Sequence, residues 1–309
     1  MDAAERKRHE DALGTPLQSR EDLIAAMLKA LTEGRGFAAG KLGPSELHWM
    51  VHPILRARSG SKLGKMLFER DLLHHGLKNS GLFPADAEFY LRYNEFYVEH
   101  VRNMDSVGIF LSDDPMERTV VRHYGLHNVI FFKDQEPDRS IPDRQDRCYL
   151  SLFRDLRVLL VCPFAELLRE RANKEVFERV WARTGKQWFH PRSVSALEFP
   201  YGFAPETHEA YPTVLDLIDE IEGRIAGMEF DVALIGAGGI AIPLASAIKR
   251  MGKIAIDLGG HLQVLFGVIG GRWRNLPEWK EGYFNDDWID MPAVYRPAQE
   301  DVCDNGAYW

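Results

Sequence analysis

The sequence predicts an α/β fold in which a parallel sheet is covered by helices on both faces. Strands and helices alternate regularly in the second half of the 309-residue chain. The predicted strands there are apolar at every position, which is typical of strands buried on both faces. The length allows one or two domains, and no segment has the composition of a linker, so we expect a single domain.

The predicted elements follow in order along the chain. Residues 1–18 are polar, and we expect a flexible N-terminus. The first half then gives helix 19–34, a strand from 37, helix 45–53 closed by proline, a helical zone at 61–79, a helix from 84, strand 107–111, helix 115–125 and strand 128–132. The second half gives strand 157–162, helix 163–183, a helix from 212, strand 230–235, helix 240–251 and strand 253–257. A loop-rich tail is expected after Asn275.

The composition narrows the classes of function. The net charge is −8 and the isoelectric point is near 5.8, which argues against nucleic acid or an anionic membrane as partner. Three cysteines, Cys148, Cys162 and Cys303, suggest neither a disulfide framework nor a metal site. The charged N-terminus and the absence of an apolar run of about 18 residues predict no signal peptide and no transmembrane segment. We therefore expect a cytoplasmic protein.

A glycine-rich turn is the sharpest motif in the chain. The run 236–241 satisfies the pattern GxGxxG/A, and Gly236, Gly238 and Gly239 allow a tight turn whose backbone N–H groups can face a phosphate. Asp257 follows about 20 residues later, at the end of the next predicted strand, where dinucleotide-binding folds hold a ribose hydroxyl. The turn predicts a ligand without naming it, and close packing of strand and helix remains the structural alternative.

Two further glycine pairs come shortly after this turn. Gly259 and Gly260 follow Asp257 directly, and a second pair precedes Arg272. Such pairs let backbone approach a ligand closely. Gln263 offers an amide on the buried side, and the Arg272 guanidinium suits a diphosphate, although a solvated arginine is the alternative.

Glu46 is the candidate catalytic residue. It follows a predicted strand and a Gly-Pro turn, which puts it at the edge of the sheet where parallel folds bind ligands. It could act as a general base, a metal ligand or a binder of sugar hydroxyls, or it could simply interact with the helix dipole. For four other groups of residues, a structural role is a stronger explanation than a functional one. They are His48 and His52, which have metal-like spacing; His74 and His75, which are expected at the surface; Glu136, in a charged loop; and the tryptophans 273, 279, 288 and 309, which could stack on sugar rings but more commonly pack in the core.

Several segments resemble bacterial GT-D-type glycosyltransferases. The strings FDVALIGAGGIAIPLA (230–245) and IDLGGHLQVLFGVIGGRW (256–273) resemble the C-terminal half of that group. The segments KLGPSEL (41–47), NSGLFP (79–84), VLLVCPF (158–164) and NGAYW (305–309) are also similar to it. The resemblance implies one Rossmann-like, GT-D-type domain over 19–309, with its nucleotide-binding half at about 155–275.

The resemblance also implies an activity. It predicts transfer of a sugar from a nucleotide-sugar donor, a UDP-sugar by expectation, to a glycan or glycoconjugate acceptor in the assembly of cell-surface polysaccharide or glycoprotein. Glu46 matches the second acid of the family's Asp-x-Glu motif, but Pro44 occupies the position of the aspartate, so a divalent Mn²⁺ or Mg²⁺ stays open. The residues expected to bind the donor are Gly236, Gly238, Gly239, Asp257, Gly259, Gly260, Gln263 and Arg272.

Two other functions compete with this one. The glycine turn and Asp257 also suit an NAD(P)-dependent oxidoreductase, although few residues follow the motif in this chain. A non-catalytic protein that binds a nucleotide or a glycan is the third interpretation, because the motif aspartate is missing. A homo-oligomer is compatible with all three.

Overall fold

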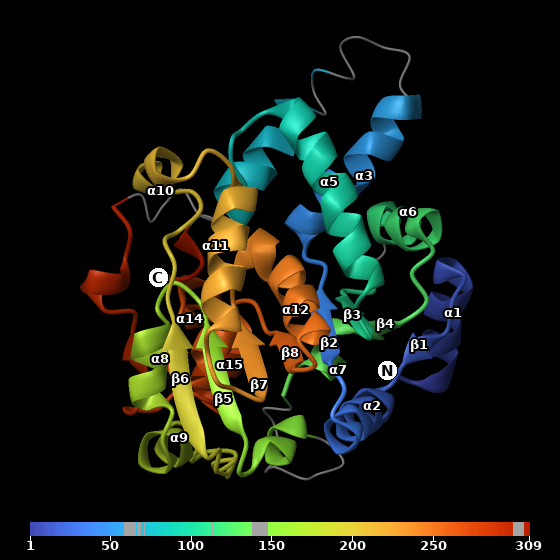
Figure 1. Cartoon of the computed structure of the whole chain (residues 1–309). Coiled ribbons are helices and arrows are strands. Elements are labelled where there is room, and N and C mark those ends of the chain that lie inside the picture. Colours follow the sequence, from blue (N-terminus) through green and yellow to red (C-terminus); the bar gives the residue numbers. More distant parts are fainter. Residues whose placement is uncertain (59–65, 67–68, 71, 113, 138–147, 299–305) are drawn as a thin grey trace.

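The computed structural model describes residues 1–58, 66, 69–70, 72–112, 114–137, 148–298 and 306–309. At its centre lies an eight-stranded sheet in which every paired strand is parallel, in the order β1-β4-β3-β2-β8-β7-β5-β6. Helices lie on both faces of the sheet (Figure 1). The predicted α/β, Rossmann-like class is therefore confirmed.

The strands of this sheet are short. They are β1 Leu17–Gln18, β2 Phe37–Lys41, β3 Ser106–Ile109, β4 Val129–Phe131, β5 Arg157–Val161, β6 Ser193–Leu197, β7 Val232–Ile235 and β8 Ile254–Asp257. A separate parallel pair joins β9 Val268–Ile269 to β10 Ile289–Asp290. The strands of the first and second halves of the chain meet where β2 pairs with β8, near the middle of the sheet.

Two layers of helices bury the two faces. Helices α3 Pro44–Arg58, α5 Ala87–Arg102, α11 Val214–Ala226 and α12 Ala241–Arg250 share one apolar core with the sheet. Helices α2 Arg20–Glu33, α8 Ala165–Arg171, α9 Lys174–Val180, α13 His261–Leu265, α14 Gly271–Arg274 and α15 Pro277–Gly282 share the other. The remaining helices are α1 Ala3–Leu13, α6 Pro115–Tyr124, α7 Phe132–Gln135, α10 Pro205–Ala210, and the short π and 3₁₀ turns η1 His75–Asn79, η2 Tyr149–Phe153, η3 Gly238–Ile240 and η4 Ala293–Tyr295.

Local capping explains several helix boundaries that the sequence predicted correctly. Ser19 and Asp22 form a capping box at the start of α2, and Gly34 ends that helix at φ 63°. The side chain of Asp114 caps α6, and Gly125 ends it at φ 64°. Each boundary is set by a side chain or a glycine whose role is local, so the sequence alone predicts it.

Two predicted helices are wrong in their extent. The helix expected to end at Pro53 continues to Arg58, because burial of its face, which includes Trp49 and Ile54, outweighs the one hydrogen bond that proline removes. The single helix expected over 163–183 is two helices, α8 and α9. Asn173 separates them, since its side chain accepts a hydrogen bond from the N–H of Val176 and so starts α9.

Several elements have no counterpart in the prediction, among them α1, β1, β6, α10, the pair β9–β10, and the helix α15, which lies in the tail that was expected to be loop-rich. Helix α1 and strand β1 lie within residues 1–18, and α1 has almost no apolar face to reveal it. Strand β6 is an edge strand with polar and half-exposed residues, so it lacks the apolar run of the central strands. Part of the helical zone predicted at 61–79 lies outside the described residues; the described part is helical and ends in the π-helix η1.

Candidate functional site

A large cavity opens at the carboxyl ends of the parallel strands. Its volume is about 1310 Å³, and it is lined by residues that directly follow β2, β3, β4, β5, β6, β7 and β8. Open parallel sheets bind ligands in this position, where loops from several strands converge. The cavity exceeds the roughly 300–1,000 Å³ of a typical small-molecule pocket, so a ligand of two or more parts fits within it.

The glycine turn after β7 forms part of the cavity wall. Gly236 and Gly238 line the cavity. Gly238 has φ +52°, a backbone conformation that residues other than glycine rarely adopt. Gly239 faces inward instead: a Cβ there would lie 2.9 Å from the side chain of Leu82 and 3.0 Å from that of Trp49. The first two glycines are thus available to a ligand, while Gly239 lets the turn pack on the core.

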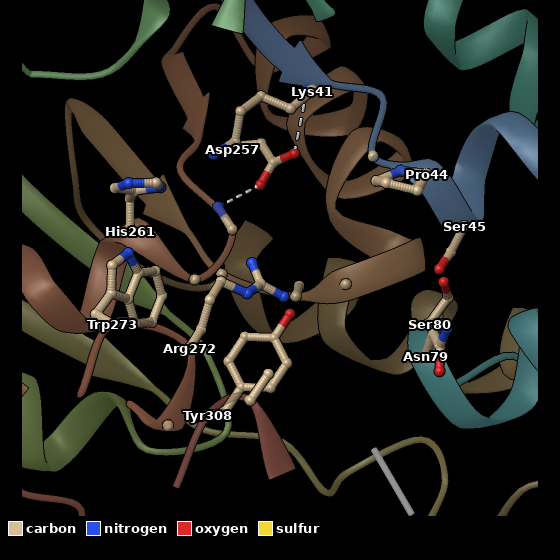
Figure 2. Close-up of a pocket in the computed structure, with 18 of the residues that line it drawn as sticks. Lys41, Pro44, Ser45, Asn79, Ser80, Asp257, His261, Arg272, Trp273 and Tyr308 are labelled. Carbon is tan, nitrogen blue, oxygen red and sulfur yellow. Dashed lines mark hydrogen bonds between the residues drawn. The ribbon is translucent and has the colours of Figure 1, made fainter. Parts of the chain in front are cut away.

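Asp257 is buried at the boundary between the two halves of the sheet. Its carboxylate accepts hydrogen bonds from the backbone N–H of Lys41 at 3.2 Å and of Gly259 at 2.8 Å (Figure 2). Burial raises the pKa of the Asp257 carboxyl, and the Lys41 ammonium partly opposes that rise. Asp257 therefore joins β2 to the turn after β8 and also lines the cavity.

Of the polar network beside Asp257, only Glu136 was named from the sequence, as a loop residue. The Lys41 ammonium lies 3.3 Å from a carboxylate oxygen of Glu136 and donates a hydrogen bond to the carbonyl of Leu258 at 2.7 Å. His261 Nδ1 lies 2.6 Å from the same oxygen of Glu136, a carboxylate that is only 2% exposed. All three side chains line the cavity. Lys41 stands at the end of a strand, and His261 follows a glycine pair. These positions were the only features of the sequence that could have marked the two residues as part of the site.

Arg272 projects from α14 into the cavity. Its guanidinium carbon lies 5.4 Å from the centre of the Tyr308 ring and 5.6 Å from that of Trp273. Gly260 makes room for these rings, because a Cβ there would lie 2.8 Å from Trp273 and 3.1 Å from Tyr308. Gly259, at φ +52°, and Gly260 both line the cavity. The glycine pair and the arginine therefore lie along one wall, with aromatic rings that orient the guanidinium.

Gln263 lies behind this wall. It is fully buried, does not line the cavity, and donates its amide to the carbonyl of Tyr308 at 3.1 Å. The C-terminal residues also pack on the second glycine pair, since a Cβ on Gly271 would lie 2.8 Å from the carbonyl of Gly306. Gln263 is thus placed to hold Tyr308 beside Arg272, and a direct contact with a donor stays a prediction.

Glu46 lines the cavity from the first turn of α3. Its side chain folds back toward Gly43 in the loop that precedes the helix. The two residues are so close that a Cβ on Gly43 would lie 2.5 Å from a carboxylate oxygen of Glu46. The side chain of Glu46 is half-buried. Burial of Tyr93 and Tyr97 raises the pKa of both phenols, and the negative charge of Glu46 raises it further. The carboxylate predicted from the sequence is therefore in the same cavity as the glycine turns.

The remaining candidates divide between the cavity and the core. Trp273, Trp279 and Trp309 line the cavity, whereas Trp288 is packed in the core. The rings of His48 and His75 stack with centroids 4.1 Å apart, and His52 is buried. Cys148 and Cys162 are buried thiols, and Cys303 lies outside the described residues.

The acidic residues that the structure describes do not fit a divalent-metal site. Among the described residues, no three His, Cys, Asp or Glu side chains gather closely enough to hold a metal ion. Pro44, near Glu46 in the sequence, offers no side-chain ligand, and the oxygens of Asp257 already accept backbone hydrogen bonds. We therefore derive no chemical step that passes through a metal.

Comparisons with known proteins are consistent with this architecture. Within the described part of the chain, no helix combines the length and hydropathy that crossing a membrane requires. The chain matches none of the curated proteins and none of the solved structures with which it was compared. A family model does match residues 212–265, which carry α11, β7, both cavity-lining glycine turns, α12 and β8. This segment is a GT-D fold-like domain.

Proposed function

We propose that this chain is a glycosyltransferase that uses a nucleotide-sugar donor. The GT-D fold-like domain at 212–265 suggests a glycosyltransferase-related function. The observation that carries the proposal further is the shared cavity, which is lined by Gly236, Gly238, Gly259, Arg272 and Glu46. One space thus combines groups suited to a diphosphate with a carboxylate suited to the reaction.

The diphosphate of the donor would bind along the wall formed by the glycine turns and Arg272. Backbone N–H groups at the start of η3 and α12 are natural partners for phosphate oxygens, and glycine lets them approach. The planar guanidinium of Arg272 matches two phosphate oxygens at once, and its position between aromatic rings limits its movement. As the glycosidic bond breaks, these donors would stabilise the charge that develops on the leaving diphosphate.

Glu46 would act at the sugar. In transfer, the acceptor hydroxyl oxygen forms a bond to the anomeric carbon, and the bond from that carbon to the diphosphate breaks. The bonding electron pair leaves with the diphosphate, and the hydroxyl proton passes to the Glu46 carboxylate, which acts as general base. Binding of donor hydroxyls by Glu46 is the alternative role for the same carboxylate.

The acceptor would be a glycan or glycoconjugate. Aromatic side chains line two parts of the cavity: Phe110 and Phe132 follow β3 and β4 on one side of the centre of the sheet, and Tyr201 follows β6 at the opposite edge, where its ring contacts that of Trp309. Their ring faces offer flat apolar surfaces of the kind that pack against the apolar face of a sugar. Assembly of cell-surface polysaccharide or glycoprotein is the process to which such an acceptor would belong.

The nucleotide-sugar function is favoured over a dinucleotide oxidoreductase by the GT-D fold-like domain at 212–265, and Asp257, on which the dinucleotide alternative depends, adds no support to that alternative. A dinucleotide fold uses this carboxylate to accept the ribose hydroxyls of the cofactor. Here the residue is 5% exposed, and its oxygens accept hydrogen bonds from the N–H groups of Lys41 and Gly259. A ribose would therefore have to compete with bonds that join the two halves of the sheet.

The test of this function is turnover by Glu46→Gln. We expect donor hydrolysis or transfer at saturating nucleotide sugar to fall by roughly 100-fold or more, because the variant keeps the shape but loses the base. Glu95→Gln, on the exposed face of α5 and outside the cavity, is the matched control and should retain normal turnover. Wild-type turnover in Glu46→Gln, with EDTA and with added Mn²⁺, would refute a catalytic Glu46.

A further inference from the structure

One corner of the cavity is not explained by diphosphate binding. It lies between the start of α3 and the end of η1, and it is lined by Ser45, Asn79 and Ser80 as well as by Glu46. In Figure 2 the side chains of Ser45 and Ser80 point toward one another, on the far side of the open space from His261 and Trp273. We call these four residues, Ser45, Glu46, Asn79 and Ser80, the serine corner.

Ser80 is the unusual member of the serine corner. The residue is 6% exposed, and among the described residues no atom forms a hydrogen bond with its side-chain Oγ. Its backbone N–H, by contrast, donates to the carbonyl of Leu77. Leaving a buried hydroxyl without a partner costs about 1–3 kcal/mol, so such a group in a cavity wall suggests that a ligand completes it.

The serine corner directly adjoins the glycine turn. A Cβ on Gly238 would lie 3.3 Å from the carbonyl of Ser80, so the two backbones touch. A donor whose diphosphate follows the turn toward Arg272 would therefore have its sugar end at this corner. The same corner holds Glu46, the carboxylate that the proposed reaction requires near the anomeric carbon.

The chemistry of the serine corner suits hydroxyl groups. Its side chains are two hydroxyls, an amide and a carboxylate, which together donate and accept hydrogen bonds. A carboxylate beside the start of α3 disfavours a second phosphate there, because like charges repel. Ser45 lies in the first turn of this 15-residue helix, where backbone N–H groups also lack helical partners.

We infer that the serine corner binds the hydroxyl groups of the donor's hexose and that Ser80 is a specificity-determining contact. This inference rests on the proposed function, since it concerns the sugar of the same donor. The ligand class is a hexopyranose linked to a nucleoside diphosphate. The serine corner then accounts for the energy by which the enzyme distinguishes a nucleotide sugar from the nucleoside diphosphate alone.

The experiment compares two dissociation constants in each variant by isothermal titration calorimetry. The probes are UDP and GDP, and their hexose conjugates UDP-glucose, UDP-galactose, UDP-N-acetylglucosamine and GDP-mannose. In Ser80→Ala we expect the best-binding nucleotide sugar to lose roughly tenfold in affinity, the loss of one buried hydrogen bond, while its parent diphosphate changes less than about twofold. Ser45→Ala tests the same corner from α3, and Ser193→Ala, exposed at the start of β6, is the control.

Thermal melting adds a readout that a structural serine would not give. Because Ser80→Ala removes a buried hydroxyl that has no hydrogen-bond partner among the described residues, the free variant should melt at or above the wild-type temperature. An unchanged affinity for the nucleotide sugar in both Ser80→Ala and Ser45→Ala would overturn the inference and leave the proposed function standing. Equal weakening of the diphosphate and its conjugate would also overturn it, since the corner would then bind phosphate. Failure of every probe to bind wild-type protein would overturn the proposed function itself.

Discussion

Replacing Arg272 by lysine separates the proposed diphosphate-binding role of this side chain from any role in stability. Arg272 is exposed on α14, and its guanidinium lies over the rings of Tyr308 and Trp273 at 5.4 and 5.6 Å. An exposed cation–π contact contributes about 0.5–1 kcal/mol, and lysine retains part of it. For a domain of this size, 1 kcal/mol corresponds to a shift of about 2–4 °C, so the free variant should melt within a few degrees of wild type.

The effect on binding should be much larger. Lysine keeps the charge but cannot form the paired N–H contacts of a guanidinium with two phosphate oxygens. A hydrogen bond to a charged group contributes about 1.5–3 kcal/mol, which corresponds to roughly 10- to 100-fold in affinity. Calorimetric titration of Arg272→Lys with the nucleoside diphosphate of the best donor measures this loss directly.

A neighbouring arginine supplies the control. Arg274 lies on the same short helix and pairs with Asp290 at 2.7 Å, outside the cavity. Arg274→Lys should therefore bind nucleotide normally. Normal binding by Arg272→Lys, together with a melting temperature far below wild type, would refute the diphosphate role and make Arg272 structural.

Three further substitutions test the packing and the charges of the fold. Gly260→Ala should lower both the melting temperature and donor affinity, because its Cβ would lie 2.8 Å from Trp273; normal values for both would show that the ring moves freely. Tyr93→Phe removes the hydrogen bond to the carbonyl of Gly239 at 2.8 Å, so chemical denaturation should show that the free energy of unfolding falls by about 1–3 kcal/mol. An unchanged free energy of unfolding would mean that water takes the place of the hydroxyl. Burial, helped by a nearby arginine, lowers the pKa of His100 from 6.5 to about 4. Between these values the unfolded chain takes up a proton that the folded chain does not, so the free energy of unfolding falls as the pH drops from 6.5 to 4. His100→Gln should therefore have a flatter pH profile of unfolding free energy than the wild type. Identical profiles in the two proteins would contradict the lowered pKa of His100.

The sequence predicts those parts of the fold that local chemistry controls. The strands β5, β7 and β8 are apolar at nearly every position because they are buried on both faces, and that pattern is visible without a structure. Strand β6 lies at the edge and has no such pattern. The path of α3 through Pro53 depends on tertiary packing of its buried face, which no local rule includes.

The candidate site was predictable to the extent that its residues follow strands. Asp257 ends β8, and Gly238 and Glu46 lie in the segments that follow β7 and β2; all three line the cavity. Gly239 and Gln263 also lie shortly after β7 and β8, yet both pack toward the core. The hydrophobic periodicity of the sequence does not distinguish residues that face the cavity from residues that face the core. Ser80 lies in the segment 79–84 that resembles the GT-D-type group, but the sequence does not single it out, because its significance lies in the lack of a partner for its hydroxyl among the described residues.

The most direct test of a nucleotide-sugar site is a thermal-shift comparison of ligand classes with the wild-type protein. The ligands are UDP-, GDP- and CMP-sugars on one side, and NAD⁺, NADH, NADP⁺ and NADPH on the other, each with and without Mn²⁺. A nucleotide sugar at 100 times its dissociation constant should stabilise the fold by about 2.7 kcal/mol, and the nicotinamide dinucleotides should leave the melting temperature unchanged. Stabilisation by a nicotinamide dinucleotide, and by none of the nucleotide sugars, would contradict the proposed glycosyltransferase.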